Sequence, residues 1–334
     1  MAAISIVIPV YNAARFLREA LVSLQAQTFT DWECICVNDG STDESPAIIR
    51  EMMAGDSRFQ LLEQANAGPS VARNRGVAHS QAPYIFFMDA DDLLYSKALE
   101  TLYQVVIKEQ VEMAWGRIVC FKDRLPEASA TGNLKIIQND ALQNWVNERF
   151  CQPSQTDVFW GIPVAACGKL FLRQRFLEVS MREGMNYGED SLFYAHVFQK
   201  LTRVGVVDAV IYGYRQVEGS LYLQRTVAWL LGYTDAHCRV LDVYKGNVRF
   251  CTNYINRPLC TGFIRMVLTD CVLAQQVALY PVVQTMCKTF LSHSAFRFAK
   301  PRLRRWLWLG AHQWWPLLRW SYKRSTLYKK SLKW

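Results

Sequence analysis

Apolar and polar segments alternate regularly over the first 120 or so residues of the chain. Residues 4–10 are rich in β-branched side chains, which predicts a buried strand. Residues 13–27 carry apolar side chains at helical spacing, which predicts a helix. These side chains are Phe16, Leu17, Ala20, Leu21 and Leu24.

The same alternation continues to residue 121. Further strands are predicted at 33–38, 59–62, 84–88 and 111–121, and further helices from the turn 39–43 to about residue 53, at 69–79 and at 96–109. Strands that alternate with helices are typical of a mainly parallel sheet covered by helices on both faces. The sequence therefore predicts an α/β fold.

Polar or turn-forming residues follow each of the first four predicted strands. Parallel sheets bind ligands at the carboxyl ends of their strands, so we expect these residues at one ligand-binding edge. They are Pro9, Tyr11 and Asn12, then Asp39, Gly40 and Ser41, then Asn66, Gly68 and Ser70, and finally Asp89, Asp91 and Asp92. Each residue alone is also typical of ordinary turns and caps, but four such strand ends together favour a site.

The carboxylates after the fourth strand are the sharpest local signal. Asp89, Asp91 and Asp92 occur within four positions, and they repel one another unless a cation lies between them or some are protonated. Hard divalent metals prefer such oxygen ligands and often share them with substrate phosphates. The alternative for Asp92 is an acidic residue at a helix N-terminus, where the helix dipole favours negative charge.

Other catalytic templates are missing from the sequence. It contains no GxxxxGK[ST], GxGxxG, HExxH or GxSxG motif, which argues against P-loop ATPases, dinucleotide dehydrogenases, zinc peptidases and α/β-hydrolases. The ten cysteines form no CxxC pair, so we expect reduced thiols in a cytosolic protein. We expect neither a signal peptide nor a transmembrane helix.

Four motifs occur in order along the first half of the chain. They are Val-Ile-Pro-Val-Tyr-Asn (7–12), Val-Asn-Asp-Gly-Ser-Thr-Asp (37–43), Asn-Ala-Gly-Pro-Ser-Val-Ala-Arg-Asn-Arg-Gly (66–76) and Asp-Ala-Asp-Asp (89–92). This set resembles the nucleotide-sugar domain of the family 2 inverting glycosyltransferases, which have the GT-A fold. The resemblance is close over residues 4–121 and looser to about residue 221, through the motifs at 168–171, 188–190 and 212–215.

The resemblance implies roles for residues at the nucleotide end of the site. Pro9, Tyr11 and Asp39 would hold the uracil of a UDP-sugar, with Asp39 accepting a hydrogen bond from the base. Ser41 and Arg73 would lie close to the nucleotide, although Arg73 could instead only fix the packing of its helix. The other members of the implied nucleotide-sugar-binding set are Asn12, Asn66, Gly68, Asp89, Ala90 and Arg215.

The resemblance also implies a metal and a base. Asp91 would be the direct ligand of Mn²⁺ or Mg²⁺, and Asp89 would bind the ribose or the water shell of the metal. Transfer with inversion needs a base for the acceptor hydroxyl, and the resemblance gives this role to Asp190, supported by Glu189. The alternative is that Asp190 caps a helix over 191–199.

Two cations near these motifs are weaker candidates. Lys169 could orient an acceptor or neutralise the acidic edge of the sheet, and Arg215 could fold over the diphosphate. The alternative for both is a structural ion pair.

Positive charge is concentrated at the C-terminus. The net charge is +9, yet residues 271–334 hold 12 Lys and Arg and no acidic residue, and residues 297–334 hold six of the eleven Trp. An apolar stripe is formed by Leu303, Leu307, Gly310, Trp314 and Leu317. Such a pattern is typical of a helix in an anionic membrane interface, broken or kinked near Pro316.

Two alternatives for this tail are a helix docked on another subunit and a nucleic-acid-binding helix. Phosphate contacts do not need six indole rings, so we expect no nucleic-acid partner.

These patterns divide the chain into four parts. We expect a GT-A catalytic domain at 1–221 with a nucleotide-binding half (1–121) and an acceptor half (122–221), a helical extension at 222–296 and a membrane-interface tail at 297–334.

The expected protein is a metal-dependent, inverting glycosyltransferase, cytoplasmic and peripheral on the inner face of the cytoplasmic membrane. It would move one sugar from a UDP-sugar to a hydroxyl of a glycan acceptor, expected to be lipid-linked, in surface polysaccharide or lipopolysaccharide synthesis. A nucleotidyltransferase and a catalytically silent nucleotide-binding module are the alternatives. A processive synthase is disfavoured because Pro316 stands where the Gln-x-x-Arg-Trp element would need Gln.

Overall fold

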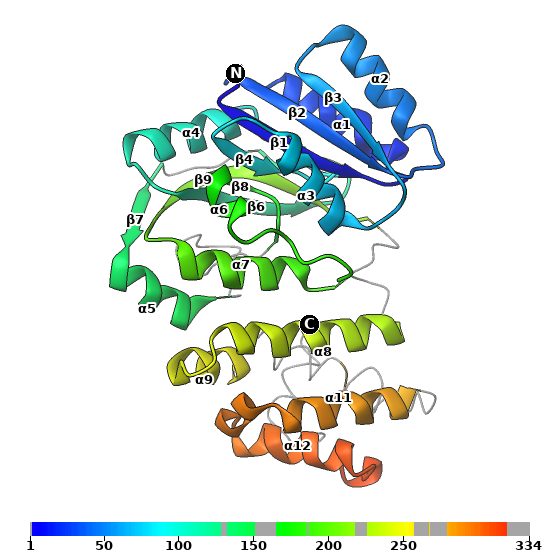
Figure 1. The fold of residues 1–334 in the computed structure, drawn as a ribbon, viewed down its shortest axis with the longest axis vertical. Helices are drawn as coiled ribbons and strands as arrows, with labels where there is room; N and C mark the ends of the chain where they lie inside the picture. The colour runs from blue at the N-terminus through cyan, green and yellow to red at the C-terminus, as the bar shows by residue number, and fades with distance from the viewer. Residues whose placement is uncertain are drawn as a thin grey trace. The chain divides into compact units, whose positions relative to one another are not determined.

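The computed structural model describes residues 2–127, 132–150, 165–185, 187–217, 226–256, 267 and 279–318. The chain divides into two compact units, residues 1–220 and 221–334. The described residues of the first unit form helices around a nine-stranded sheet, and those of the second unit form mainly helices (Figure 1).

The first half of the sheet consists of parallel strands joined by helices. The strands are β1 (Ile4–Val10), β2 (Trp32–Asp39), β3 (Phe59–Gln64) and β4 (Tyr84–Phe87), and the helices are α1 (Ala14–Gln25), α2 (Ser45–Gly55) and α3 (Pro69–His79). Their spatial order is β3-β2-β1-β4, with every pair parallel. The predicted elements of this half are confirmed to within a few residues.

Helices cover both faces of this half-sheet. On one face, α1 buries its apolar stripe in the core, together with alternate residues of β1. On the other face, Ala72 of α3 packs on Ile35 and Val37 of β2. A Cβ at Gly76 of α3 would lie 2.4 Å from Cγ1 of Val7, so glycine lets this helix approach the sheet closely.

The second half of the sheet mixes parallel and antiparallel strands. Its strands are β5 (Leu93–Leu94), β6 (Met113–Phe121), β7 (Leu134–Gln138), β8 (Lys169–Leu172) and β9 (Arg203–Arg215), and the helices are α4 (Ala98–Lys108), α5 (Asn139–Arg149), α6 (Arg173–Leu177) and α7 (Glu189–Lys200). β8 lies between β4 and β6 and is antiparallel to both, whereas β6 and β9 are parallel. The expected α/β fold is confirmed, and the insertion of β8 places Lys169 inside the sheet.

The topology brings distant segments to one edge of the sheet. β1, β2 and β4 run in the same direction, so their carboxyl ends meet there as predicted. β5, directly after the carboxylates 89–92, pairs with β9 through Leu93 and Gly213. The end of β9 therefore lies beside the acidic turn.

The second unit is built from α8 (Val227–Val243), α9 (Val248–Asn256), α11 (Tyr280–Ser292), the 3₁₀ helix η3 (Ser294–Phe298) and α12 (Pro301–Ala311). α11 packs against both α8 and α12. None of the helices within the described residues combines the length and apolar character required to cross a bilayer. Most of the apolar run 263–283 and all of 319–334 lie outside the described residues.

The apolar stripe predicted for the membrane is largely covered within the second unit. Leu303, Leu307 and Gly310 are buried, and a Cβ on Gly310 would lie 2.6 Å from Sγ of Cys287 on α11. The prediction that this stripe faces a membrane is wrong for these three residues, because helix periodicity identifies an apolar face but not its partner.

The other side of α12 is polar and aromatic. Arg302, Arg305 and Trp308 are exposed there, and so is Trp314 after the helix. The helix breaks near Pro316, as expected: the break lies at Gln313, whose φ is 61°, and Pro316 itself falls inside the next helical segment, 315–318.

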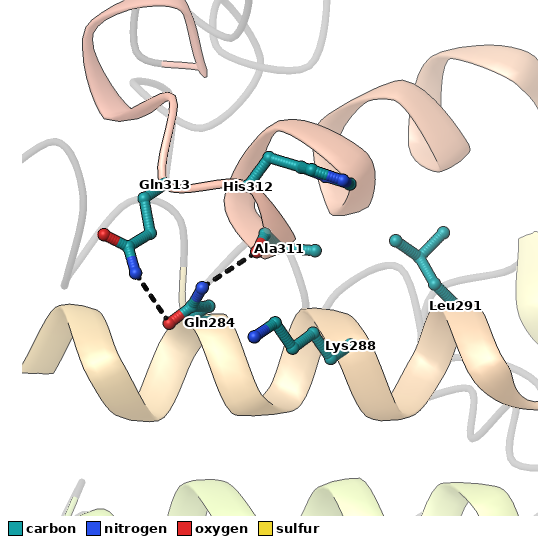
Figure 2. Close-up of a pocket in the computed structure, with 6 residues that line it drawn as sticks. All are labelled: Gln284, Lys288, Leu291, Ala311, His312 and Gln313. Carbon is teal, nitrogen blue, oxygen red and sulfur yellow. Dashed lines mark hydrogen bonds between the residues drawn. The ribbon is translucent and has the colours of Figure 1, made fainter.

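A surface hollow of about 530 Å³ lies on the second unit (Figure 2). It is lined by Gln284, Lys288, Leu291, Ala311, His312 and Gln313. Nε2 of Gln284 donates to the carbonyl of Ala311 at 2.9 Å, and Nε2 of Gln313 donates to Oε1 of Gln284 at 3.0 Å. These bonds fix the break after α12, and no residue of the predicted site lines the hollow.

Candidate functional site

Side chains connect the ends of the first two strands. The backbone N–H of Asn12, after β1, donates to Oγ of Ser41 at 3.0 Å, and its Oδ1 accepts from the N–H of Thr42 at 2.8 Å. Asn12 has a φ of 48°, a left-handed conformation that asparagine tolerates better than most residues. Tyr11 is 54% exposed, so its ring faces solvent, and Pro9 is half-buried in β1.

Asp39, at the end of β2, orders the loop between β3 and α3. Its buried carboxylate accepts three hydrogen bonds of 2.8 Å, from N–H groups of Gln64, Ala67 and Gly68. Gly40 has a φ of 74°, and a Cβ there would lie 2.9 Å from the backbone N of Asn66. The two loops that carry the predicted nucleotide-binding residues are therefore packed on each other.

Arg73 of α3 lies among the acidic residues. Its side chain is 6% exposed, and its guanidinium donates to Oδ1 of Asp89 at 2.8 Å and to Oδ1 of Asp190 at 3.4 Å. Oε1 of Glu189 lies 3.9 Å from Nη1. A buried guanidinium is stabilised by paired carboxylates, so Arg73 connects the acids after β4 with those that begin α7.

Asp92 is fully buried and bonds to β9. Its Oδ2 accepts from the Tyr212 hydroxyl and its Oδ1 accepts from the Arg215 N–H, both at 2.7 Å. The Tyr212 oxygen in turn accepts from the N–H of Asp89 at 3.0 Å. The alternative of a helix N-terminus for Asp92 is wrong, because α4 begins only at Ala98.

Asp91 has fewer partners than its neighbours. Burial, and then the charge of Asp89, raise the pKa of Asp91 to about 6. Nε of Arg215 donates to the backbone carbonyl of Asp91 at 2.8 Å, but no side chain in the described ranges donates to its carboxylate. Ala90, between the two acids, is buried.

These acids fit a hard divalent cation. Asp89 disfavours the charge on Asp91, and a cation between them would remove this repulsion. Carboxylate oxygens suit Mn²⁺ and Mg²⁺. Ligand atoms of Asp89, Asp92 and Cys167 also lie within 4.8 Å of one another, but Asp92 is already hydrogen-bonded and a thiol suits softer metals. The pair Asp89 and Asp91 is therefore the better match.

Asp190 is held by groups outside its own helix. α7 begins at Glu189, after Gly188 with a φ of 73°, and Oδ2 of Asp190 accepts from the N–H of Ala166 at 2.8 Å. The alternative that Asp190 caps a helix over 191–199 is therefore wrong. Burial raises the pKa of Asp190, while Arg73 acts against this shift, and its side chain is 26% exposed.

Arg215 forms a structural ion pair, which was the alternative to a role over the diphosphate. Its Nη2 donates to Oε2 of Glu19 on α1 at 2.7 Å. Its guanidinium lies over the rings of Phe16 and Phe121, 4.7 Å from each centroid. These contacts anchor Arg215 beside the acidic turn.

Lys169 is fully buried, and no carboxylate of the described residues forms an ion pair with it. Its Nζ donates to the backbone carbonyls of Ala165 at 2.6 Å and Cys167 at 3.3 Å. Burial lowers the pKa of Lys169 to about 8.

Two residues that were not predicted, Tyr212 and Ala166, also bind the acids of the site. Tyr212 belongs to the motif 212–215, but it follows Asp92 by 120 residues, so no local pattern indicates their contact. Ala166 contributes a backbone N–H, which the sequence pattern does not reveal.

Comparisons with known proteins identify the family of the chain. The sequence model of the family described as glycosyl transferase family 2 matches residues 5–180. The chain is 30% identical over 238 residues to glycosyltransferase GlyA of Streptococcus pneumoniae serotype 4, which covers 70% of this chain and 33% of GlyA. It is 42% identical over 111 residues to the uncharacterized glycosyltransferase YibD of Escherichia coli K12, which covers 33% of this chain and 32% of YibD. The chain therefore spans about a third of the length of these two relatives.

A solved structure shares the fold. The crystal structure of S. aureus TarS 1-349 matches with a TM-score of 0.71 at 15% identity, over 99% of this chain and 92% of that chain. The same fragment in complex with UDP-GlcNAc matches with a TM-score of 0.73 at 16% identity. The predicted GT-A fold is confirmed. The family match covers more than half of the sequence, and the chain therefore belongs to glycosyl transferase family 2.

Proposed function

We propose that the chain transfers one sugar from a UDP-sugar to a hydroxyl group of a glycan acceptor, with inversion at the anomeric carbon. The contact of Arg73 with both Asp89 and Asp190 carries this proposal, because it joins the expected nucleotide site and the expected base in one cluster. Similar structures of TarS are complexes with UDP-GlcNAc and with UDP, which supports a UDP-sugar donor.

In this proposal Asp190 is the base. It takes the proton of the acceptor hydroxyl while the hydroxyl oxygen bonds to the anomeric carbon and the bond to the UDP oxygen breaks. Two features suit Asp190 to this role: its carboxylate is partly exposed, and burial raises its pKa, which strengthens it as a base. Glu189 supports it beside Arg73.

The donor is expected along the edge formed by the ends of β1, β2 and β4. The exposed Tyr11 ring and the ordered Asp39 loop fit the base, and Arg73 fits the diphosphate. Asp91 and Asp89 would hold Mn²⁺ or Mg²⁺, which when bound stabilises negative charge on the leaving diphosphate.

Asp190→Asn tests the base. We expect UDP binding, measured by calorimetry with Mn²⁺, to stay nearly unchanged while turnover of a UDP-sugar falls by about 10²-fold or more. The matched control is Asp31→Asn, at an exposed acid far from the cluster in sequence. Near-wild-type turnover of Asp190→Asn would remove Asp190 from the mechanism.

The same assay separates the alternatives. A silent nucleotide-binding module would bind UDP without Mn²⁺-dependent hydrolysis of any UDP-sugar. A nucleotidyltransferase would release pyrophosphate from a nucleoside triphosphate instead.

We further propose that residues 297–334 hold the protein at the cytoplasmic face of the membrane, next to a lipid-linked acceptor. The exposed side of α12 supports this proposal, because it combines Arg302 and Arg305 with Trp308, and Trp314 follows. The two Trp side chains are 45% and 52% exposed, with ring centroids 5.6 Å apart. Trp prefers the headgroup level, and basic residues contribute about 1 kcal/mol each near an anionic leaflet.

Co-sedimentation with anionic vesicles tests the membrane proposal. Trp308→Ala with Trp314→Ala should lower binding to phosphatidylserine vesicles, whereas Val22→Ala, an exposed apolar residue of α1, should not. Unchanged binding after removal of residues 297–334 would refute the proposal.

A further inference from the structure

Lys169 is an unusual member of the sheet. Its side chain is completely buried in β8, where a charge is costly unless a partner compensates it. Among the residues that the structure describes, no carboxylate lies within ion-pair distance of Nζ. The direct contacts come instead from neutral groups, namely the carbonyls of Ala165 and Cys167 and the ring of Tyr194, whose centroid is 4.5 Å away. The charge of Asp190 adds a favourable interaction from beyond ion-pair distance.

The segment 165–167 is bound at three consecutive carbonyls. Lys169 holds the first and the third, and the hydroxyl of Tyr194 donates to the second, that of Ala166, at 3.0 Å. Tyr194 is itself fully buried on α7. Two buried side chains therefore fix the orientation of this short stretch of backbone.

The N–H groups of a backbone fixed by its carbonyls have fixed directions as well, because the peptide unit is planar. The N–H of Ala166 points to Oδ2 of Asp190 at 2.8 Å. The second donor to this carboxylate, Arg73, is more distant at 3.4 Å and is shared with Asp89. Of these two donors, the Ala166 N–H therefore makes the shorter hydrogen bond to the Asp190 carboxylate.

We propose that Lys169 is a positioning residue for the base: it clamps the carbonyls of Ala165 and Cys167 so that the Ala166 N–H holds the Asp190 carboxylate toward the acceptor hydroxyl. The inference rests on the proposed role of Asp190. Lys169 does not touch the acceptor, since its ammonium is buried and bonded to carbonyls. Misplacement of a reacting group by about 1 Å costs up to about 10²-fold in rate, which makes such a clamp consequential.

Lys169→Met, which keeps an unbranched side chain of nearly the same length and removes the ammonium group, tests this clamp in the full chain. We expect turnover to fall at least about tenfold, with the donor KM and the calorimetric affinity for UDP changed by less than about twofold. Lys200→Met, at an exposed lysine that ends α7, is the matched control and should retain wild-type turnover.

A double-mutant cycle separates positioning from a general structural role. If Lys169 acts through Asp190, Lys169→Met should cost nothing further in the Asp190→Asn background. A similar loss in both backgrounds, wild-type turnover of Lys169→Met, or a loss of UDP affinity in step with turnover would overturn the proposal. Wild-type turnover of Asp190→Asn alone would instead refute the proposed function.

Tyr194→Phe tests the proposed positioning of Asp190 if Lys169→Met does not fold. This variant keeps the ring under Nζ and removes only the hydrogen bond to Ala166. It should lower turnover several-fold in the wild-type background and leave the residual turnover of Asp190→Asn unchanged. Equal losses in both backgrounds, or none in the wild type, would count against the clamp.

Discussion

Nη1 of Arg73 lies 3.4 Å from Oδ1 of Asp190, although 117 residues separate them in the sequence. The contact depends on the close approach of α3 to the sheet at Gly76 and on α7, which presents Asp190 in its first turn. The same guanidinium binds Asp89. The Arg73 side chain therefore contacts both an acid of the expected donor site and the expected base.

Arg73→Lys should break this relationship while keeping the charge. An ammonium is a compact point charge and cannot reproduce the planar fork with which arginine contacts two separate carboxylates. We expect turnover to fall by about 10²-fold and the affinity for UDP with Mn²⁺ to weaken as well, measured by product release and calorimetry. Arg75→Lys, at an exposed position of the same helix, is the control, and equal effects of the two variants would contradict the prediction.

Turnover should depend on pH through Asp190. Only the deprotonated carboxylate accepts a proton, and burial raises its pKa, so activity should decline on acidification at a higher pH than the ordinary aspartate value of about 4. The measurement is kcat at saturating donor and acceptor over a pH series. Because Arg73 opposes the shift, the acidic limb of Arg73→Met should move to still higher pH. If the acidic limb of the kcat profile has its midpoint at or below about pH 4, the base does not have the raised pKa of the buried Asp190 carboxylate.

The nucleotide half of the fold follows closely from the sequence. β1, β2 and β4 are almost entirely buried, and α1 carries a clear apolar stripe, so the pattern of apolar positions predicts them. The parallel topology then places Asp39 and Asp89 at one edge. Motif order added the expectation for Asp190. Arg73 was expected near the nucleotide, but its simultaneous contact with two acidic segments depends on tertiary packing that no local pattern encodes.

One expectation and two alternatives failed because a distant partner decides the role of a residue. Asp92 has the sequence context of a helix start, but it bonds to Tyr212 on β9. Asp190 has the context of a cap, but it bonds to Ala166 and Arg73. The stripe containing Leu307 suggested a lipid-facing surface, but it packs inside the second unit. In each case the local pattern described the residue correctly, but it carries no information on a neighbour that is distant in the sequence.

The second unit should lose stability on acidification through His237. Burial lowers the pKa of His237 to about 4 from 6.5, and Nδ1 contacts the Tyr254 hydroxyl at 2.8 Å. The unfolded chain therefore binds the proton first, so stability is complete above about pH 6.5 and is lost as pH falls toward 4. At 1.36 kcal/mol per unit, the shift corresponds to a loss on the order of 3 kcal/mol.

Thermal unfolding followed by circular dichroism over this pH window measures the effect. In His237→Gln, a polar group remains near Tyr254 but cannot titrate, so the slope of Tm against pH should flatten. His79→Gln, at an exposed histidine of α3, should keep the wild-type slope. A slope that survives in His237→Gln would assign the acid sensitivity to another group.

Gly310→Ala distinguishes a packed stripe from a lipid-facing one. The new Cβ would lie 2.6 Å from Sγ of Cys287 on α11, and overpacking of this kind costs typically about 1–3 kcal/mol. If Gly310 instead faced solvent or lipid, alanine would stabilise the helix by up to about 1 kcal/mol. The sign of the change in unfolding free energy therefore reports the environment of α12. The matched control is Gly55→Ala in α2, where a Cβ meets nothing within 4 Å and stabilisation is expected.

Cys287→Ala completes the test because it removes Sγ, the atom with which the new Cβ of Gly310→Ala would clash. Alone, this variant should destabilise the second unit modestly by leaving a small cavity. Combined with Gly310→Ala, it should restore much of the lost stability, since the added methyl group occupies the space that Sγ leaves. Denaturant unfolding of the four proteins gives the coupling energy. Additive losses would show that the two residues are not in contact, and the packing of α12 on α11 would then have to be revised.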